Sequence, residues 1–175
     1  MQELEESLVK MLWLKVTGEP PEETLLALQR LREEQGPFFS WLLADAPEGG
    51  WSETALEILL YLAVTVQQVV AWRQIPKGPL KLPLIDDVTL KAQAEKRERS
   101  VGACLRGKES QAKPLDEAIE GLVDRFDLPQ LALLGHAVEG VLAACEDGDL
   151  TRVESEAAFV RLLVFIDLID RLVKS

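Results

Sequence analysis

The chain has 175 residues, of which 47% are hydrophobic and 28% are charged, and 30 acidic against 19 basic residues give a formal net charge of −11. This length corresponds to one domain or two small ones, and the apolar fraction is that of a globular chain rather than a disordered one. The surplus of carboxylates argues against a general affinity for nucleic acid or for an anionic membrane, because like charges repel.

The charge is spread unevenly along the chain. Residues 73–113 hold ten of the nineteen basic residues and five acidic ones, so this segment has a net charge of +5 and the remainder has −16. No aromatic residue follows Trp72 within the segment, which disfavours base stacking on nucleic acid. We expect a solvated or internally paired surface here. The alternative is docking on the acidic part of a second copy, which would favour self-association.

The rare residues exclude several classes of protein. Cys104 and Cys145 are far apart, which fits neither a disulfide scaffold nor a clustered zinc site. The first ten residues are acidic and amphipathic, unlike a secretory signal. The longest uncharged stretch, residues 58–72, has fifteen residues and is shorter than the roughly 20 that a membrane span needs. We therefore expect a cytoplasmic protein with no membrane segment, no metal and no cofactor.

Helical periodicity dominates the chain and strand signals are almost absent, so we predict an all-α bundle of seven or eight helices. In chain order, the predicted helices span residues 2–16, 21–35, 38–44, 53–74, 87–105, 115–126, 128–146 and 151–174.

In the first half, glycine and proline separate the helices. Gly18 ends the first helix, and a proline pair starts the second, whose Leu25, Leu28 and Leu31 are expected to point inward. Ser52 is a suitable N-cap for the fourth helix. That helix is apolar nearly all round from residue 58 to 70, so it should be central.

Four aromatic residues lie on short segments beside glycine and proline: Phe38, Phe39, Trp41 and Trp51. We expect them to plug the core under a loop. The alternative is an exposed anchor for a partner, since tryptophan and phenylalanine are favoured at binding interfaces.

Residues 75–83 hold three prolines in nine residues, which is typical of a linker or a fixed extended strap. The predicted organisation is an N-terminal helical subdomain (1–74), a linker (75–86) and a C-terminal four-helix bundle (87–175), with one continuous domain as the alternative. Asp86 and Asp87 are expected to be the N-cap and a first-turn acid of the helix that follows, with a metal-binding or phosphate-linked acid pair as the alternative.

Two further capping patterns occur in the second half. Asp127 with Gln130 resembles a capping box at the start of the helix over 128–146. Thr151-x-x-Glu154 has the same form and should open the last helix, whose broad apolar stripe should close the bundle.

One resemblance bears on function. The stretch from Leu131 to Leu142 contains His136-Ala137-Val138-Glu139 between spaced leucines, and a long apolar helix follows the turn at residues 146–150. With these motifs, residues 113–174, about a third of the chain, resemble the histidine phosphotransfer domain, in particular the phosphoacceptor domain of chemotaxis-type histidine kinases.

The resemblance implies a docking helix just before these motifs. In that family the preceding helix carries H-x-x-K-G. The histidine takes a phosphoryl group, and the glycine leaves room for a response-regulator receiver to approach. The matching residues here are Glu117-Ala118-Ile119-Glu120-Gly121, so the glycine is present but glutamates replace the histidine and the lysine. The resemblance thus implies a non-enzymatic interaction module in two-component signalling. Its expected partner is a receiver or a kinase, and its expected partner-binding residues are Glu117, Glu120, Gly121 and Asp124.

Three alternatives stay open. In a second register, His136 with Glu139 and Gly140 spells H-x-x-E-G, which would make His136 the phosphoacceptor. An enzyme with a carboxylate or metal pocket between the helical halves is another reading, although the chain has one histidine and no P-loop, G-x-G-x-x-G or H-E-x-x-H motif. The third is a plain homo-oligomeric helical scaffold.

Overall fold

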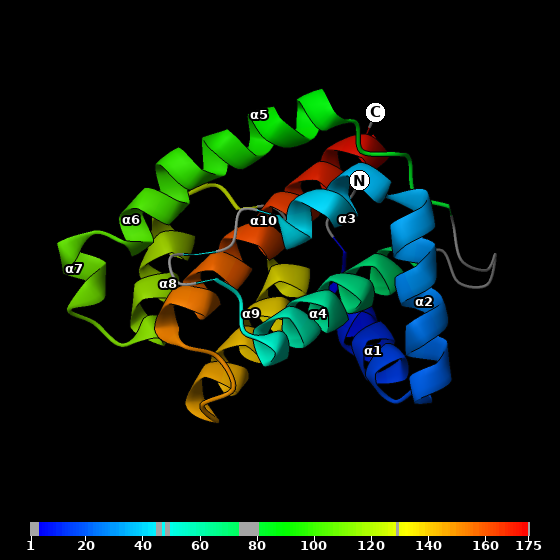
Figure 1. Cartoon of the computed structure of the whole chain (residues 1–175), viewed down its shortest axis with the longest axis horizontal. Coiled ribbons are helices and arrows are strands. Elements are labelled where there is room, and N and C mark those ends of the chain that lie inside the picture. Colours follow the sequence, from blue (N-terminus) through cyan, green and yellow to red (C-terminus); the bar gives the residue numbers. More distant parts are fainter. Residues whose placement is uncertain (1–3, 45–46, 48–49, 74–80, 129, 175) are drawn as a thin grey trace.

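The computed structural model describes residues 4–44, 47, 50–73, 81–128 and 130–174. Within these ranges the chain forms helices and no strands, so the predicted all-α bundle is confirmed (Figure 1). The elements are α1 (Glu6–Thr17), α2 (Pro21–Glu34), α3 (Gly36–Leu43), α4 (Glu53–Ala71), α5 (Asp87–Arg97), η1 (Glu98–Gly102), α6 (Ala103–Leu105), α7 (Lys108–Gln111), α8 (Leu115–Arg125), α9 (Leu131–Glu146) and α10 (Arg152–Lys174).

Each of the eight helices predicted from the sequence forms. The helix predicted over 87–105 is continuous in space, but its backbone widens to a π-helical turn in η1 before α6 completes it. The short α7 was not expected.

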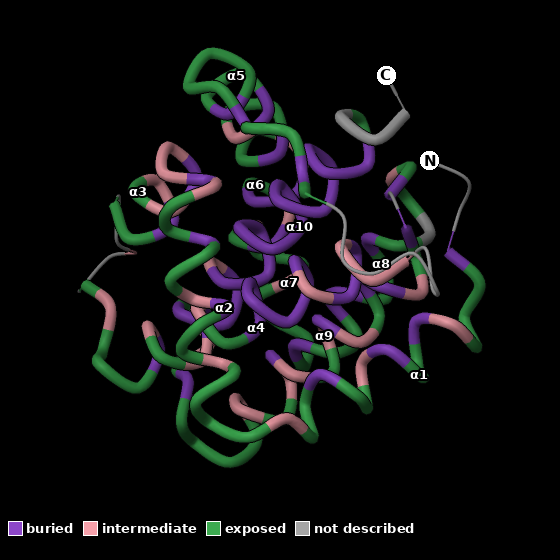
Figure 2. Tube along the Cα trace, turned by 90° about the vertical axis from the view of Figure 1, so that its right-hand side faces the viewer, coloured by how far each residue is buried: buried purple, intermediate pink, exposed green. Residues whose placement is uncertain are grey.

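Two helices form the centre of the molecule. α10 packs against α9, α5 and α4, and α4 packs against α1, α2 and α9. Residues 158–170 of α10 are all buried, and so is most of α4 from Leu62 to Val70 (Figure 2). The apolar circumference of α4 therefore reflects its central place, as predicted. Helices from both halves of the chain share this one hydrophobic core.

α4 is, among the described helices, the one that passes a test of length and composition for crossing a membrane. Of its apolar window, 56% is buried inside the structure. A core helix has the same composition as a membrane span, and the packing of α4 against four other helices accounts for its apolar character.

Side-chain caps start three of the helices as predicted. The Ser52 hydroxyl accepts a hydrogen bond from the Ala55 N–H at the start of α4. Asp86 accepts from the backbone N–H groups of Val88 and Thr89 at the start of α5. At the start of α10, Thr151 and Glu154 form a reciprocal capping box.

Two predictions about individual residues were wrong. Gln130, expected as the third residue of a capping box with Asp127, is itself the N-cap of α9, with φ at 48° and its side chain turned inward. Its amide accepts from the Leu4 N–H (2.9 Å) and donates to Asp170 (2.6 Å), and these long-range bonds hold the backbone in the left-handed region. Leu25, expected to point inward, is 66% exposed, because α2 buries the neighbouring stripe of Ala27 and Leu31.

The proline-rich segment is described from Lys81 onward; residues 75–80 of the predicted linker lie outside the described part. Residues 81–86 have no helix, and Leu82 and Ile85 are buried. The buried Gln35 side chain donates to the Pro83 carbonyl and accepts from the Ile85 N–H. This part of the segment is therefore an extended strap fixed to the end of α2.

Candidate functional site

The predicted partner-binding residues lie on α8. Its apolar side packs inward and consists of four buried residues: Leu115, Ala118, Ile119 and Leu122. Glu117, Glu120 and Gly121 are exposed at i, i+3 and i+4 positions, so the structure brings them together on one outer face. Asp124 follows on the same helix, and its side chain lies outside the described part of the structure.

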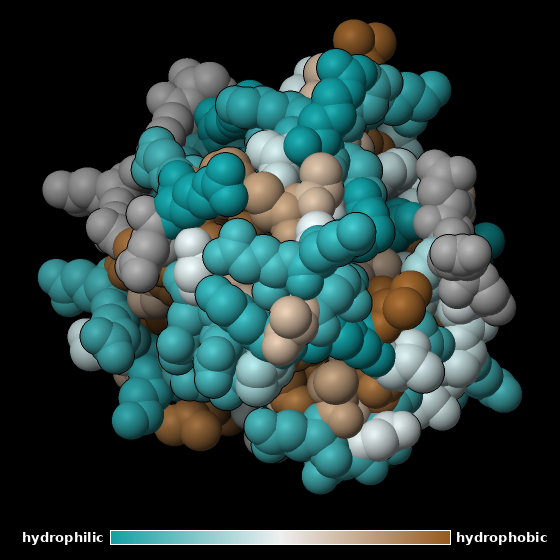
Figure 3. All heavy atoms as spheres, turned by 90° about the vertical axis from the view of Figure 1, so that its left-hand side faces the viewer, coloured by the Kyte–Doolittle hydropathy of each residue, from teal (hydrophilic) through white to brown (hydrophobic). Residues whose placement is uncertain are grey.

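This face is open to solvent and carries net negative charge. A Cβ built at Gly121 would meet no atom within 4 Å, so the surface beside the two glutamates is unobstructed. In the described part of the chain neither Glu117 nor Glu120 takes part in an ion pair. Figure 3 shows the left-hand side of Figure 1, where α7 and α8 lie, and this side is covered mostly by hydrophilic side chains.

A polar cluster at the start of α10 anchors the turn that leads into α8. Arg152 donates to the backbone carbonyls of Ser110 (2.7 Å) and Lys113 (2.5 Å) and pairs with the buried Glu156 (2.8 Å). Gln111 donates to the same Glu156 carboxylate. The position of α8 is thus set by its buried side and by this cluster. None of the described contacts that hold α8 in place involves its acidic face.

His136, the alternative phosphoacceptor, lies on α9 facing α1. Its ring stacks on Trp13 with 5.4 Å between centroids, and its Nδ1 lies 3.1 Å from a Glu139 carboxylate oxygen. The side chain is 22% exposed. His136 and Glu139, together with Leu4 and Leu131, border an open hollow of about 600 Å³ between the start of α1 and α9.

The aromatic segment is mainly a core plug, as the first of the two interpretations predicts. Phe38 is fully buried and stacks on Phe165 of α10 at 4.0 Å. The guanidinium of Arg161 lies over the rings of Trp41 and Trp51 and donates to backbone carbonyls at the end of α3. Phe39, by contrast, is half-buried at the surface beside α2.

The basic segment is partly neutralised from within. The ion pairs that its residues form are Arg97–Asp167, Arg99–Glu95, Arg106–Glu98 and Lys113–Glu109. Three of these pairs join neighbours on the same stretch of surface, whereas Arg97–Asp167 is buried. The segment therefore offers a mixed surface rather than an uninterrupted basic one.

Sequence reasoning missed the buried polar layer between α5, α9 and α10. The Arg97 guanidinium donates to both oxygens of Asp167, at 2.5 and 2.9 Å, and the Gln93 amide donates to the same carboxylate. One turn further along α10, Asp170 accepts from Gln130. The available signal was the pair of aspartates in the otherwise apolar run of residues 162–170, because buried carboxylates require donors.

Side chains that could ligate a metal ion are not clustered among the described residues. No group of three or more His, Cys, Asp or Glu side chains there is placed to hold a metal ion. Two open hollows lie on the molecular surface, one beside His136 and one beside α2. Comparison with protein-family models, with curated proteins and with solved structures found no match to this chain.

Proposed function

We propose that this chain is a non-enzymatic protein-interaction module whose docking surface is the outer face of α8. The observation that carries the proposal is the combination of Glu117, Glu120 and Gly121 on one exposed, unobstructed face of a helix whose other side is fixed in the core. A rigid helix face loses little conformational entropy when a partner binds to it.

The charge of this face indicates the kind of partner. Exposed carboxylates without internal partners favour a surface that carries lysine or arginine, and such complementarity mainly steers encounter and orientation. Because residues 113–174 resemble the phosphotransfer domain, the candidate partner is a receiver or a kinase of a two-component pathway. We propose a cytoplasmic location for this module. Two widely spaced cysteines without a disulfide are consistent with that location.

The proposal excludes phosphotransfer through α8. A glutamate at position 117 cannot form the phosphoimidazole that the family uses, so the module would dock without accepting a phosphoryl group. Both described hollows are open ones, and the hollow beside His136 is lined in part by Glu5, Glu6 and Glu139, whereas the enzyme alternative requires a deep cleft.

Binding to a panel of isolated receiver domains and kinase phosphoacceptor-binding domains tests the docking surface. The wild-type chain is immobilised and each domain is titrated over it. We expect at least one domain to bind with micromolar affinity, and we expect the double reversal Glu117→Lys with Glu120→Lys to weaken that binding about tenfold or more.

The matched control is the double reversal Glu57→Lys with Glu146→Lys. These exposed residues lie on α4 and α9, so the control changes the net charge equally without altering α8. Equal loss of binding in both double variants would show a general charge effect and would contradict the proposal. Absence of binding to every domain would contradict it as well.

A labelling experiment separates this function from the second register. The chain is incubated with a receiver domain phosphorylated with radiolabelled phosphate, and transfer is followed on gels. We expect no label on the wild-type chain. Label on the wild type that disappears in His136→Gln would overturn the proposal in favour of His136 as a phosphoacceptor.

A further inference from the structure

The outer face of α2 carries a stripe that the proposed function does not use. Glu22, Leu25, Gln29 and Arg32 follow one another at spacings of three, four and three residues and are all exposed. This spacing places them on one line along the helix, as in the contact positions of paired helices. We call these four residues the α2 stripe.

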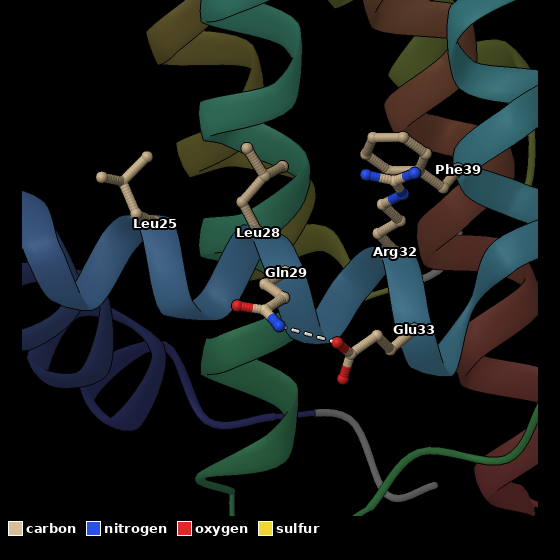
Figure 4. Close-up of a pocket in the computed structure, with 6 residues that line it drawn as sticks. All are labelled: Leu25, Leu28, Gln29, Arg32, Glu33 and Phe39. Atoms are coloured by element: carbon tan, nitrogen blue, oxygen red, sulfur yellow. Dashed lines mark hydrogen bonds between the residues drawn. The ribbon is translucent and has the colours of Figure 1, made fainter.

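A groove of mixed lining runs between α2 and α3 and includes part of the stripe. It has a volume of about 540 Å³, and its lining combines Leu25, Leu28 and Phe39 with Gln29, Arg32 and Glu33. Figure 4 shows the two leucine side chains on the same side of α2 as the Phe39 ring, with the Arg32 guanidinium next to that ring. Leu25 is 66% exposed, so a large apolar side chain stands in solvent at one end of the groove.

The charges along the stripe have a direction. Glu22 lies in the first turn of α2 and Arg32 lies in its last turn. Ten residues separate them, which is about 15 Å along a helix. The stripe is therefore negative at one end and positive at the other, with the uncharged Leu25 and Gln29 between.

We propose that the α2 stripe pairs with the same stripe of a second copy of this chain, in an antiparallel, two-fold arrangement centred near residue 27. In that arrangement Glu22 lies opposite Arg32 of the second copy at both ends, and Leu25 lies opposite Gln29. The two helices would also run in opposite directions, so the positive end of each helix dipole would lie beside the negative end of the other. A parallel arrangement would place like charges together, so the stripe is complementary to itself in one orientation.

The expected dimer is weak. α2 has 14 residues and so is about 21 Å long, which makes its face smaller than the roughly 800 Å² that each partner contributes to a standard interface. Exposed ion pairs contribute about 1 kcal/mol or less, so they set the orientation more than the affinity. We expect a dissociation constant of micromolar or higher.

Analytical ultracentrifugation of the full chain, from about 1 µM to about 1 mM, tests the pairing. The expected result is a shift from the monomer mass of 19.5 kDa toward twice that mass as concentration rises. Leu25→Lys should keep the chain monomeric. The control Leu14→Lys replaces a leucine of matching exposure on α1, 64% against 66%, and should leave the shift intact.

A charge swap tests the antiparallel orientation. Glu22→Arg alone and Arg32→Glu alone each place like charges opposite each other and should weaken the dimer about tenfold. The double variant restores both pairs and should restore dimerisation, and mixing the two single variants should give a heterodimer. Circular dichroism of each variant shows whether it is folded, and we expect no loss because both residues are exposed.

A monomer at every concentration would overturn the proposal, and so would a dimer that Leu25→Lys leaves intact. Single charge variants that dimerise as well as the wild type would overturn the antiparallel pairing. None of these readouts involves α8, so failure here and failure of the proposed function are distinguishable.

Discussion

Glu154 should be a main source of acid sensitivity in this protein. Its carboxylate accepts hydrogen bonds from the Thr151 N–H and hydroxyl at the start of α10 and from the Ser52 N–H at the start of α4. Burial raises the pKa of this carboxyl, but the hydrogen bonds outweigh burial and lower the pKa from 4.5 to about 2. One charged group therefore joins the N-termini of the two central helices, where negative charge is favoured.

The magnitude follows from the shift in pKa. Each pKa unit corresponds to about 1.4 kcal/mol, so lowering the pKa from 4.5 to about 2 stabilises the folded state by about 3 kcal/mol when Glu154 is ionised. The folded-state pKa lies below the unfolded one, so this stability is present above about pH 5 and is lost as the pH falls toward 2. About 2 kcal/mol of it should be lost by pH 3.

Urea unfolding of the wild type and Glu154→Gln between pH 7 and pH 3 measures this contribution. A neutral amide cannot accept all of these hydrogen bonds, so we expect the variant to be less stable by about 2–3 kcal/mol at pH 7. The difference should narrow by roughly 1 kcal/mol at pH 4 and by about 2 kcal/mol at pH 3. The control Glu57→Gln removes an exposed carboxylate of α4 and should show no such trend.

A stability difference between wild type and Glu154→Gln that stays constant with pH would refute this reasoning. The same holds for a variant as stable as the wild type at pH 7. In either case the carboxylate would not gain its stability from being ionised between the two helix ends.

Three further predictions concern the stability of the folded chain. Asp167→Ala leaves the buried Arg97 guanidinium without its carboxylate and should cost about 3–5 kcal/mol in chemical denaturation, whereas the double variant Arg97→Met with Asp167→Leu should recover most of that loss. Gly121→Ala should raise the melting temperature by gaining about 1 kcal/mol of helix propensity, because its Cβ would meet no atom within 4 Å. Gly140→Ala should lose about 1 kcal/mol or more instead, because its Cβ would lie 2.7 Å from a methyl group of Leu62, which is packed in the core.

The helices could be predicted because their signals are local. Proline pairs, glycines and capping residues mark the ends, and apolar spacing marks the buried side, as at Ser52 and Thr151. The widened turn of η1 has no such signal: the helix over 87–105 reads as regular, and the π-helical turn follows immediately after Arg97, which is tied to Asp167 on another helix.

The departures from prediction depend on contacts between distant residues. Gln130 takes a left-handed backbone because its side chain bonds to Leu4, 126 residues away, and to Asp170. Glu154 was expected to cap its own helix. It also accepts a hydrogen bond from the Ser52 N–H at the start of α4, which is 102 residues away in the chain. Spacing along the sequence cannot reveal such partners.

The same limit applies to the candidate site. The residues 117, 120 and 121 share a helix face by spacing alone, so their grouping was predictable. Their exposure and the open space beside Gly121 depend on where α6 and α7, which pack against α8, lie. The groove at α2 was missed because Leu25 was assigned to the core. A leucine at helical spacing is assigned inward by pattern, and only the packing of Ala27 and Leu31 against α4 shows that the buried stripe is rotated away from it.

The two proposed surfaces lie at opposite ends of the molecule, with α8 at the left and α2 at the right in Figure 1. A dimer formed through α2 would therefore leave both α8 faces accessible and would present them on opposite outer sides. A partner that is itself dimeric or clustered would then bind with an avidity beyond the single-site affinity. Leu25→Lys should lower the apparent affinity for such a partner immobilised at high density, while its affinity for the same partner at low density should match the wild type.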